Sequence, residues 1–576
     1  MCEHCHHAEH DEHETILHKI KNGEIFDEKF LMGIAIVGAV CIGEYLEALM
    51  VFILYNIGEF LQDKAVEKSK KSITELMDLR PDTVNVLVGD KVIKQSPQNV
   101  NINDIIIAKT GEKTALDGVV VEGTAFIDTS ALTGEAFPRE VKVGDEILSG
   151  CIISNGFVKI RAEKTFAQST VSEILELVEH AKNKKAKAEN FITKFARIYT
   201  PFVVGLALII GVLTPLILQA DFFEWLKRAL TLLVISCPCA LVISVPLGFF
   251  AGIGGASRNG VLVKGSKYIE ALAKAKAVAF DKTGTLTKGH FSIEKVVSTG
   301  NLPEEEILKL IVSIEKFSNH PIAKSILNSY SGDFFEDVTD ISEISGKGLR
   351  GKINGDEVCA GNKEFVNAPD CGEIGNIIYL SKNGTLEGYV VLCDVLKPES
   401  VKTISELKKQ SIRTYMLSGD NDEIVQKIAS ILKLDKAYSK LLPQEKLYKF
   451  EEIVKAIPQT QTALYVGDGI NDAPVLKRAD VGIAMGGIGS DCAVESADVI
   501  IMNDNPYKVF EAIKISQKTM KIVKQNIIFA ISVKAVFLAL GTFGMMTMWG
   551  AIFADVGVTL LAILNSLRAM HSPLCK

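Results

Sequence analysis

Long apolar runs, separated by two polar stretches, set the pattern of the chain. A membrane-spanning helix needs about 20 apolar residues, and four runs of the chain approach or reach this length. They are Phe202–Leu218, Leu230–Phe250, Ile527–Met546 and Ala551–Leu567. Two further helices are predicted within Phe30–Leu61, where Gly43-Glu44-Tyr45 indicates a tight hairpin. The pattern therefore predicts six transmembrane helices, with both termini on the same side of the membrane.

The charges that flank these runs predict their orientation. The short connectors at 43–45, 219–225 and 547–550 contain no Lys or Arg, whereas the opposite helix ends are rich in both. Cytoplasmic loops carry an excess of Lys and Arg. We therefore expect a multi-pass protein of the cell membrane, with its soluble domains and both termini in the cytosol.

The two polar stretches differ in their patterns. Residues from about 70 to 185 contain short β-branched runs such as "VNVLVGD" and "GVVVEGT", punctuated by Gly and Asp, which predict a β-rich domain. Residues 258–510 alternate strands such as "AVAF" (277–280) and "TALYVGD" (462–468) with helical patterns. That alternation is typical of an α/β domain.

Composition agrees with this division. A chain of 576 residues is long enough for several domains, and its 48% hydrophobic content suits a membrane protein. The net charge of −7 offers no basic surface of the kind that nucleic acid requires. The eleven cysteines are scattered rather than arranged as a disulfide framework, so we expect reduced thiols. The N-terminal residues are polar and do not resemble a signal peptide.

The sequence Asp281-Lys282-Thr283-Gly-Thr-Leu-Thr follows directly after the strand that ends at Phe280. The carboxyl ends of parallel strands are where open α/β sheets place their active sites. A carboxylate there can attack phosphate and form an aspartyl phosphate. Asp281 is therefore a candidate nucleophile.

Three more segments accompany it, and with them the chain resembles a P-type ATPase over nearly all of residues 25–570. They are "LSGDN" (417–421), Lys446 in "PQEK", and "GDGINDAP" (467–474). The resemblance implies ATP as substrate and Mg²⁺ as cofactor. It also implies a nucleophile, a divalent metal and a cation, which are the parts that phosphoryl transfer needs.

The resemblance assigns roles to individual residues. It implies that Asp281, Thr283 and Asp468 hold Mg²⁺, and that Lys446 neutralises the phosphoryl oxygens. Ser418 stands where the family has Thr, and retains the hydroxyl. The full predicted catalytic set is Asp281, Lys282, Thr283, Ser418, Asp420, Lys446, Asp468, Asn471, Asp472 and Glu135.

Two other motifs match the family in the soluble stretches. "TGEAFP" (133–138) resembles the actuator motif, whose glutamate, here Glu135, positions the water that hydrolyses the aspartyl phosphate; Ala136 replaces its usual Ser. "EKFSNHP" (315–321) and "SGKGL" (345–349) resemble the nucleotide-binding elements of the heavy-metal branch. The implied nucleotide-binding residues are Glu315, His320, Gly346 and Gly348.

The implied fold is a multidomain membrane protein. A six-helix transmembrane bundle carries a β-rich actuator domain and an α/β haloacid-dehalogenase-like phosphorylation domain, into which an α+β nucleotide-binding domain is inserted. The predicted order is a Cys/His-rich tail (1–28), a helix pair (29–66), the actuator (67–190), a second helix pair (191–257), the phosphorylation domain (258–292 and 395–510) around the nucleotide-binding domain (293–394), and a last helix pair with the C-terminal tail (511–576).

The second helix pair contains Cys237-Pro238-Cys239. Proline breaks a helix, and metal-binding groups inside a membrane usually mark an ion path. Cys-Pro-Cys resembles the heavy-metal P-type ATPases, and thiolates alone serve both copper(I) and zinc.

Carboxylates in the other helices favour a divalent ion. Asp555 and Lys534 in the last helix pair, with Glu47 and Glu59 in the first, match the zinc/cadmium/lead branch. The implied ligands of the transported ion are Cys237, Cys239 and Asp555, with Glu47, Glu59 and Lys534 along its pathway. Lys534 is expected to act as a counter-ion to Asp555; the alternative is that this pair only stabilises the bundle.

The N-terminal tail "MCEHCHHAEHDEHE" is rich in Cys and His and is predicted to deliver or buffer metal; the alternative is a plain polar tail. Its candidate ligands are Cys2, His4, Cys5, His6 and His7. His571 and Cys575 could add weak ligands. Family members also carry two helices before the first core helix, and here the tail leads straight into that helix, as expected of a minimal variant or a truncation.

The sequence thus predicts an ATP-driven exporter of Zn²⁺ or Cd²⁺, with Pb²⁺ as a further cargo, acting through an aspartyl phosphate. We expect a monomer in the lipid bilayer whose partners are divalent heavy-metal ions, with no nucleic acid. Two alternatives stay open at this point: a copper(I) exporter, and a membrane metal sensor or buffer that does not pump.

Overall fold

A computed structural model describes residues 28–75, 81, 83–89, 91–129, 138–169, 172, 185–236, 239–318, 321–330, 336–344, 347–369, 371–373, 375–468, 472–486 and 496–570. The chain divides into two compact units, residues 1–273 with 511–576, and residues 274–510. Each unit is described by itself.

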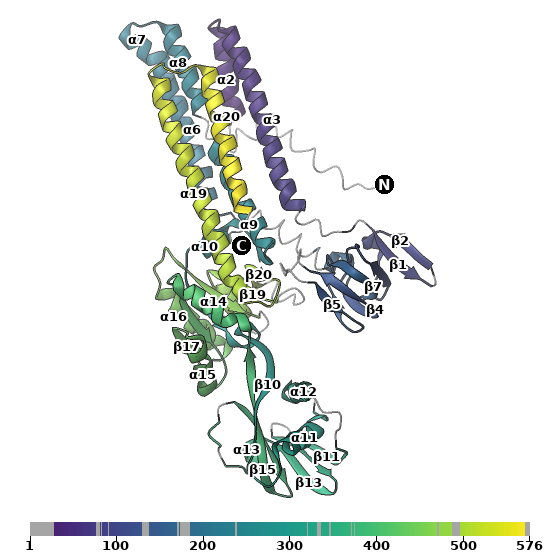
Figure 1. The fold of residues 1–576 in the computed structure, drawn as a ribbon. Coiled ribbons are helices and arrows are strands. Elements are labelled where there is room, and N and C mark those ends of the chain that lie inside the picture. Colours follow the sequence, from purple (N-terminus) through teal and green to yellow (C-terminus); the bar gives the residue numbers. More distant parts are fainter. Residues whose placement is uncertain are drawn as a thin grey trace. The chain divides into compact units, whose positions relative to one another are not determined.

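The first unit contains a bundle of long apolar helices (Figure 1). Its elements are α2 (Glu28–Cys41), α3 (Tyr45–Glu75), α6 (Lys187–Leu208) continued by a π turn (Ile209–Leu213) and α7 (Thr214–Leu218), α8 (Phe222–Ile235), α9 (Cys239–Ser257), α10 (Ser266–Ala273), α19 (Tyr507–Thr542), α20 (Met548–Leu567) and a last 3-10 turn (Arg568–Met570). A short strand, β8 (Val261–Val263), follows α9.

Four segments of the described chain are long and apolar enough to cross a membrane: Pro201–Leu218, Phe222–Ser257, Tyr507–Thr542 and Gly550–Met570. The predicted hairpin forms between α2 and α3, but α2 is short and the second half of α3 is polar. The count of six spans therefore stays a prediction. Helix α8 ends at Ile235 and α9 begins at Cys239; the helix break predicted at Pro238 lies outside the described residues and stays a prediction.

Small residues allow the bundle helices to approach closely. Ala35 and Ala39 of α2 are fully buried in the same cluster as Leu230, Leu232 and Ile235 of α8. A side chain at Gly58 of α3 would lie 2.5 Å from Val556 on α20. Membrane helices gain little from apolar burial and depend on such tight contacts.

A buried polar network links three of these helices. Asn526 on α19 donates to Ser566 Oγ on α20 at 2.8 Å, and Ser566 Oγ lies 2.8 Å from the carbonyl oxygen of Ser244 on α9. Because an unpaired polar group in an apolar interior is costly, this network fixes the register of the three helices.

The first unit also contains an antiparallel sheet, as the β-rich pattern predicts. Its order is β2 (Lys91–Gln95), β1 (Val84–Val88), β3 (Ile105–Lys109), β7 (Ile152–Ala162), β4 (Gly118–Asp128) and β5 (Arg139–Val141), with β6 (Glu146–Ile147) also paired to β4. Two 3-10 turns, Pro97–Asn99 and Phe166–Gln168, flank it. Val86 of β1, Ile106 of β3 and Val120 of β4 are among the residues of its buried face.

The second unit contains two sheets. The first is parallel, in the order β17 (Lys436–Tyr438), β16 (Arg413–Leu417), β9 (Ala275–Asp281), β18 (Thr462–Gly467), β19 (Val481–Met485) and β20 (Val499–Ile501). Its helices are α14 (Pro398–Lys409), α15 (Asp422–Leu432), α16 (Pro443–Lys455) and α17 (Ala473–Arg478). The fully buried strand residues, such as Ala277, Phe280 and Tyr465, explain why the sequence runs of these strands are continuously apolar.

The second sheet is antiparallel and is inserted between β9 and β16 in the sequence. Its order is β10 (Thr287–Ser298), β15 (Thr385–Leu396), β14 (Asn376–Lys382), β13 (Asp356–Gly361), β12 (Gly348–Ile353) and β11 (Val338–Ile344). Its helices are α11 (Glu304–Glu315), α12 (Pro321–Ser329) and α13 (Lys363–Val366). The antiparallel pair of β10 and β15 connects this insertion to the parallel sheet.

The close contact of α3 with α20 leads to a prediction. The change Gly58→Ala is expected to lower the thermal stability of the detergent-solubilised protein, because overpacking typically costs about 1–3 kcal/mol. Gly557→Ala on α20 is the matched control, since nothing lies within 4 Å of a side chain there. Equal unfolding temperatures for the two variants would contradict the packing described.

Candidate active site and ion path

Asp281 lies at the carboxyl end of β9, the strand that is flanked on both sides by parallel strands, β16 and β18. The apolar run that ends at Phe280 forms this buried strand, and a positive φ of 71° at Gly284 turns the chain after it. Asp281 is therefore presented at the edge where the strands end, as predicted.

Lys446, in the first turns of α16, binds two carboxylates. Its Nζ lies 2.6 Å from Asp281 Oδ1 and 3.0 Å from Asp472 Oδ1, and all three side chains are buried. Burial lowers the pKa of Lys446, but the charges of Asp281 and Asp472 outweigh this and raise it. The charged form of the lysine is therefore favoured in contact with Asp281, the candidate nucleophile.

Burial raises the pKa of Asp281 to about 7. The negative charges of Asp472 and Asp468 also raise this pKa, whereas the positive charge of Lys446 lowers it. One ammonium thus faces two carboxylates, with the charge of Asp468 nearby. Without a further cation, the site keeps an excess of negative charge.

The residues present fit a magnesium ion. Asp472 Oδ2 is buried and has no hydrogen-bond partner among the described residues. Glycine at 467 leaves room for this carboxylate, because a side chain there would lie 2.6 Å from Asp472 Oδ2. Carboxylate oxygens are the ligands that Mg²⁺ prefers. When bound, Mg²⁺ supplies positive charge that neutralises phosphate oxygens.

Lys282 forms a second buried cluster beside the nucleophile. Its Nζ lies 3.2 Å from Asp394 Oδ2 and also pairs with Asp420. Thr287 Oγ1 lies 2.7 Å from the same Asp394 oxygen. The Ser418 hydroxyl accepts a bond from the Asp420 backbone amide at 3.2 Å, so the hydroxyl retained from the family motif orders this loop.

Sequence reasoning missed three residues of this region: Asp394, Lys397 and Asp504. The ammonium of Lys397 is buried and donates to the Gly284 carbonyl at 2.6 Å and to Asp504 Oδ1 at 2.7 Å. It therefore fixes the turn that follows Asp281. The available signal was the charged pair in "CDVLKP" (393–398), where the insertion returns to the parallel sheet.

A cavity of about 250 Å³ lies in the inserted domain and contains two predicted nucleotide residues, Glu315 and Gly348. At Gly348 a side chain would lie 2.2 Å from the Ala360 carbonyl oxygen, so only glycine fits this close approach. Burial raises the pKa of Glu315 to about 7, and the charge of Glu343 adds to this effect. Glu343, which also lines the cavity, was not predicted.

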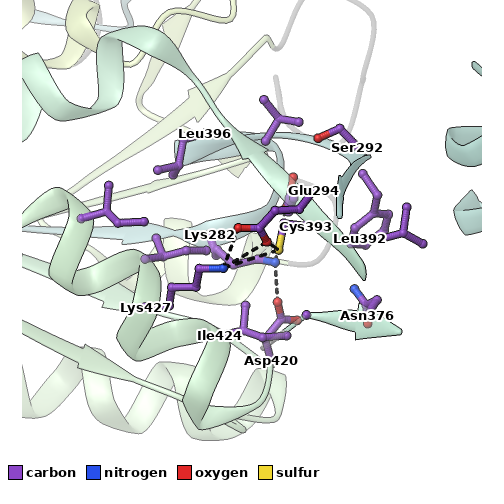
Figure 2. Close-up of a pocket in the computed structure, with 16 residues that line it drawn as sticks. Lys282, Ser292, Glu294, Asn376, Leu392, Cys393, Leu396, Asp420, Ile424 and Lys427 are labelled. Atoms are coloured by element: carbon purple, nitrogen blue, oxygen red, sulfur yellow. Dashed lines mark hydrogen bonds and ion pairs between the residues drawn. The ribbon is translucent and has the colours of Figure 1, made fainter. Parts of the chain in front are cut away.

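A second cavity, of about 290 Å³, lies where the β10–β15 pair meets the parallel domain (Figure 2). Glu294 on β10, Cys393 on β15 and Lys427 on α15 point toward one another there. Lys427 Nζ lies 3.0 Å from Glu294 Oε1, and Cys393 Sγ lies 2.5 Å from Glu294 Oε2. Burial raises the pKa of Cys393 to about 11, so its thiol stays protonated and donates to Glu294.

In the helix bundle, Lys534 of α19 and Asp555 of α20 form an ion pair of 3.0 Å, and both side chains are mostly buried. Lys534 Nζ also donates to the carbonyl oxygen of Ile235 at 3.0 Å. Ile235 is the last residue of α8, so this pair lies at the C-terminal end of that helix.

The two predicted glutamates of α3 lie in different surroundings. Glu47, in the first turn, pairs with Lys227 at 2.9 Å. Glu59, three turns further, accepts a bond from Tyr55 Oη at 2.9 Å.

Two segments of the chain match known protein families. Residues 78–179 match the P-type ATPase actuator domain, and residues 275–480 match haloacid dehalogenase-like hydrolases. A zinc-transporting ATPase of Synechocystis is 46% identical over 563 residues, covering 96% of this chain and 78% of that protein. The chain belongs to the heavy-metal-transporting P-type ATPases.

Two more comparisons agree with this P-type ATPase assignment. A cadmium, zinc and cobalt-transporting ATPase of Bacillus subtilis is 45% identical, covering 97% of this chain and 81% of that protein. A crystal structure of a zinc-transporting PIB-type ATPase in its E2.Pi state superposes with a TM-score of 0.65 at 32% identity, covering 96% of this chain and 92% of that one. The ATPase hydrolyses ATP and uses Mg²⁺, as predicted.

Several predicted site residues lie outside the described residues, and their roles stay predictions. They are Glu135, Cys237, His320, Gly346, Asn471, the tail residues Cys2, His4, Cys5, His6 and His7, and His571 and Cys575. The backbone of Cys239 begins α9, but its side chain is likewise not described.

The contacts of Lys397 lead to a prediction. Lys397→Met is expected to slow phosphorylation of the ATPase by about ten- to hundredfold, because misplacing a reacting group by about 1 Å can cost that much. Lys397→Arg, which retains a cation, should recover part of the rate. The measurement is the rate of acid-stable labelling by ATP. Lys409→Met, exposed on the same helix, is the control.

The raised pKa of Glu315 leads to a second prediction. The folded ATPase favours the neutral carboxyl of Glu315. The stability that this side chain contributes is therefore complete below its ordinary pKa of 4.5 and is lost as the pH rises through about 7. Glu315→Gln stays neutral, and its unfolding temperature without nucleotide should rise relative to the native protein by a few degrees between pH 6 and 8.

The control for this experiment is Glu364→Gln, an exposed residue of α13. If both variants follow the native pH dependence, then Glu315 is charged throughout this range and the assigned shift is wrong.

Proposed function

We propose that this ATPase exports Zn²⁺ and Cd²⁺, with Pb²⁺ as a further cargo, across the cell membrane. The observation that carries the proposal is the buried pair of Lys534 and Asp555 beside the end of α8. A charged pair inside a membrane bundle is expensive and marks an ion path. The names of the Synechocystis and Bacillus relatives, which transport zinc and cadmium, support the choice of cargo.

Phosphoryl transfer follows from the cluster around Asp281. The carboxylate attacks the γ-phosphate of ATP, its bond to the β-phosphate breaks, and ADP leaves. Lys446, already 2.6 Å from Asp281, stabilises charge on the transferred oxygens. Asp281, Thr283 and Asp468 are proposed to hold Mg²⁺. Glu135 is proposed to orient the water that later hydrolyses the aspartyl phosphate.

ATP is proposed to bind between the inserted domain and this cluster. Glu315, His320, Gly346 and Gly348 would contact the nucleotide. Lys282 and Asp420 are proposed to order the phosphate end, because Lys282 is anchored to both Asp420 and Asp394.

Cargo binding is proposed at Cys237, Cys239 and Asp555, with entry near Glu59 and exit near Glu47. Two thiolates, one carboxylate and the Lys534 ammonium together balance a soft divalent ion, whereas a copper(I) ion would not need the carboxylate. When the ion leaves, Lys534 would neutralise Asp555 as it does in the structure. Binding to thiolates requires deprotonation, so metal affinity should fall in acid.

Neither alternative function is favoured. The named relatives are zinc and cadmium transporters rather than copper(I) exporters. A sensor without turnover would not need the cluster of Lys446 and Asp281 that the structure contains. We further propose that the soluble domains and termini are cytosolic, that the protein is a monomer without nucleic-acid partners, and that the Cys/His tail buffers metal.

The proposal predicts metal-stimulated hydrolysis. Purified protein should hydrolyse ATP faster with Zn²⁺ or Cd²⁺ than with copper(I), and ATP should leave an acid-stable label that Asp281→Asn abolishes. Replacing Cys237, Cys239 and Asp555 together should remove stoichiometric metal binding while the label from back-reaction with inorganic phosphate remains. Stimulation by copper(I) alone would refute the cargo.

A further inference from the structure

A second lysine–carboxylate cluster lies at the hairpin end of the bundle. Lys227, in the second turn of α8, places Nζ 2.9 Å from Glu44 Oε1 and 2.9 Å from Glu47 Oε1. Glu44 lies in the connection between α2 and α3, and Glu47 in the first turn of α3. One cation therefore bridges two carboxylates that come from a different helix pair.

This cluster is incompletely neutralised. Two carboxylates face one ammonium, and Glu47 Oε2 is buried without a hydrogen-bond partner among the described residues. A buried, unpaired carboxylate oxygen is costly and points to a ligand that is bound only part of the time. A divalent cation would match the charge of the two carboxylates, but only if Lys227 withdrew.

The position of the cluster connects it with the ion path. Lys227 precedes Ile235, whose carbonyl oxygen binds Lys534, by eight residues on one helix, a distance of about 12 Å. The two lysine–carboxylate pairs thus lie two turns apart along α8, one beside its C-terminal end and the other at the hairpin end.

We propose that Lys227 is a second built-in counter-ion, which occupies Glu44 and Glu47 when no ion is leaving and so opposes return of the exported cation. The inference rests on the proposed function. A departing Zn²⁺ or Cd²⁺ passes the two carboxylates and displaces Lys227; the ammonium then closes on them again. Lys227 is a positioning residue, because it acts through the carboxylates rather than on the cargo.

The test measures inhibition from the exit side. The full-length protein is sealed in vesicles with its ATP-binding domains outward, and hydrolysis stimulated by a fixed external Zn²⁺ concentration is measured against increasing internal Zn²⁺. Each rate is normalised to that of the same variant without internal metal. Lys227→Met should lower the inhibitory internal concentration by about three- to tenfold, the size expected for partly exposed ion pairs.

Three variants make the result specific. Lys227→Arg should restore the native value, since it retains the cation. Arg228→Met is the matched control, because that neighbouring cation pairs with the exposed Glu224 instead. Glu44→Gln removes one carboxylate and should raise the inhibitory concentration, which tests the proposal even if Lys227→Met fails to fold.

The outcomes separate the two claims. Inhibition of Lys227→Met equal to that of Arg228→Met, or no change in Glu44→Gln, overturns the counter-ion role of Lys227 alone. A native protein that neither Zn²⁺ nor Cd²⁺ stimulates overturns the proposed function, and with it the inference.

Discussion

Neutralisation of buried carboxylates by lysine is the constraint on which this structure depends. Asp281 is paired with Lys446, Asp555 with Lys534, and Glu47 with Lys227. Leaving such a carboxylate unpaired in an apolar interior typically costs several kcal/mol. Each carboxylate that is proposed to meet a phosphate, a metal or a leaving ion therefore needs a partner for the part of the cycle in which that ligand is absent.

The candidate phosphorylation site and the helix bundle use the same chemistry with different charge balances. At the candidate phosphorylation site one ammonium faces both Asp281 and Asp472, so added positive charge is favourable there. In the bundle, Lys534 faces Asp555 alone and also binds the Ile235 carbonyl. A balanced pair does not need a further ion, so cargo binding depends on additional negative charge, which the proposed thiolates of Cys237 and Cys239 would supply.

Local patterns in the sequence were enough to predict the elements of this fold, but not its ion pairs. The strand before Asp281 and the hairpin at Gly43 are local features, and the structure has both near their predicted places. The pairing of Lys397 with Asp504, or of Lys227 with Glu44, joins residues about 100 or more positions apart. Only the packing of helices and strands brings such residues together, so no short motif marks them.

The inserted domain is connected to the parallel sheet by the antiparallel pair of β10 and β15, so motion of one domain can reach the other through these two strands. Irregular pairing follows Thr287 and Ile293 on β10, and bulges of this kind bend a strand locally. The same ribbon carries Thr287 and Asp394, which share the oxygen that binds Lys282, next to the nucleophile. Bending of β10 against β15 must therefore move the partner of Lys282. The nucleotide binding proposed for the inserted domain and the charge placement around Asp281 would thus be connected through the backbone itself.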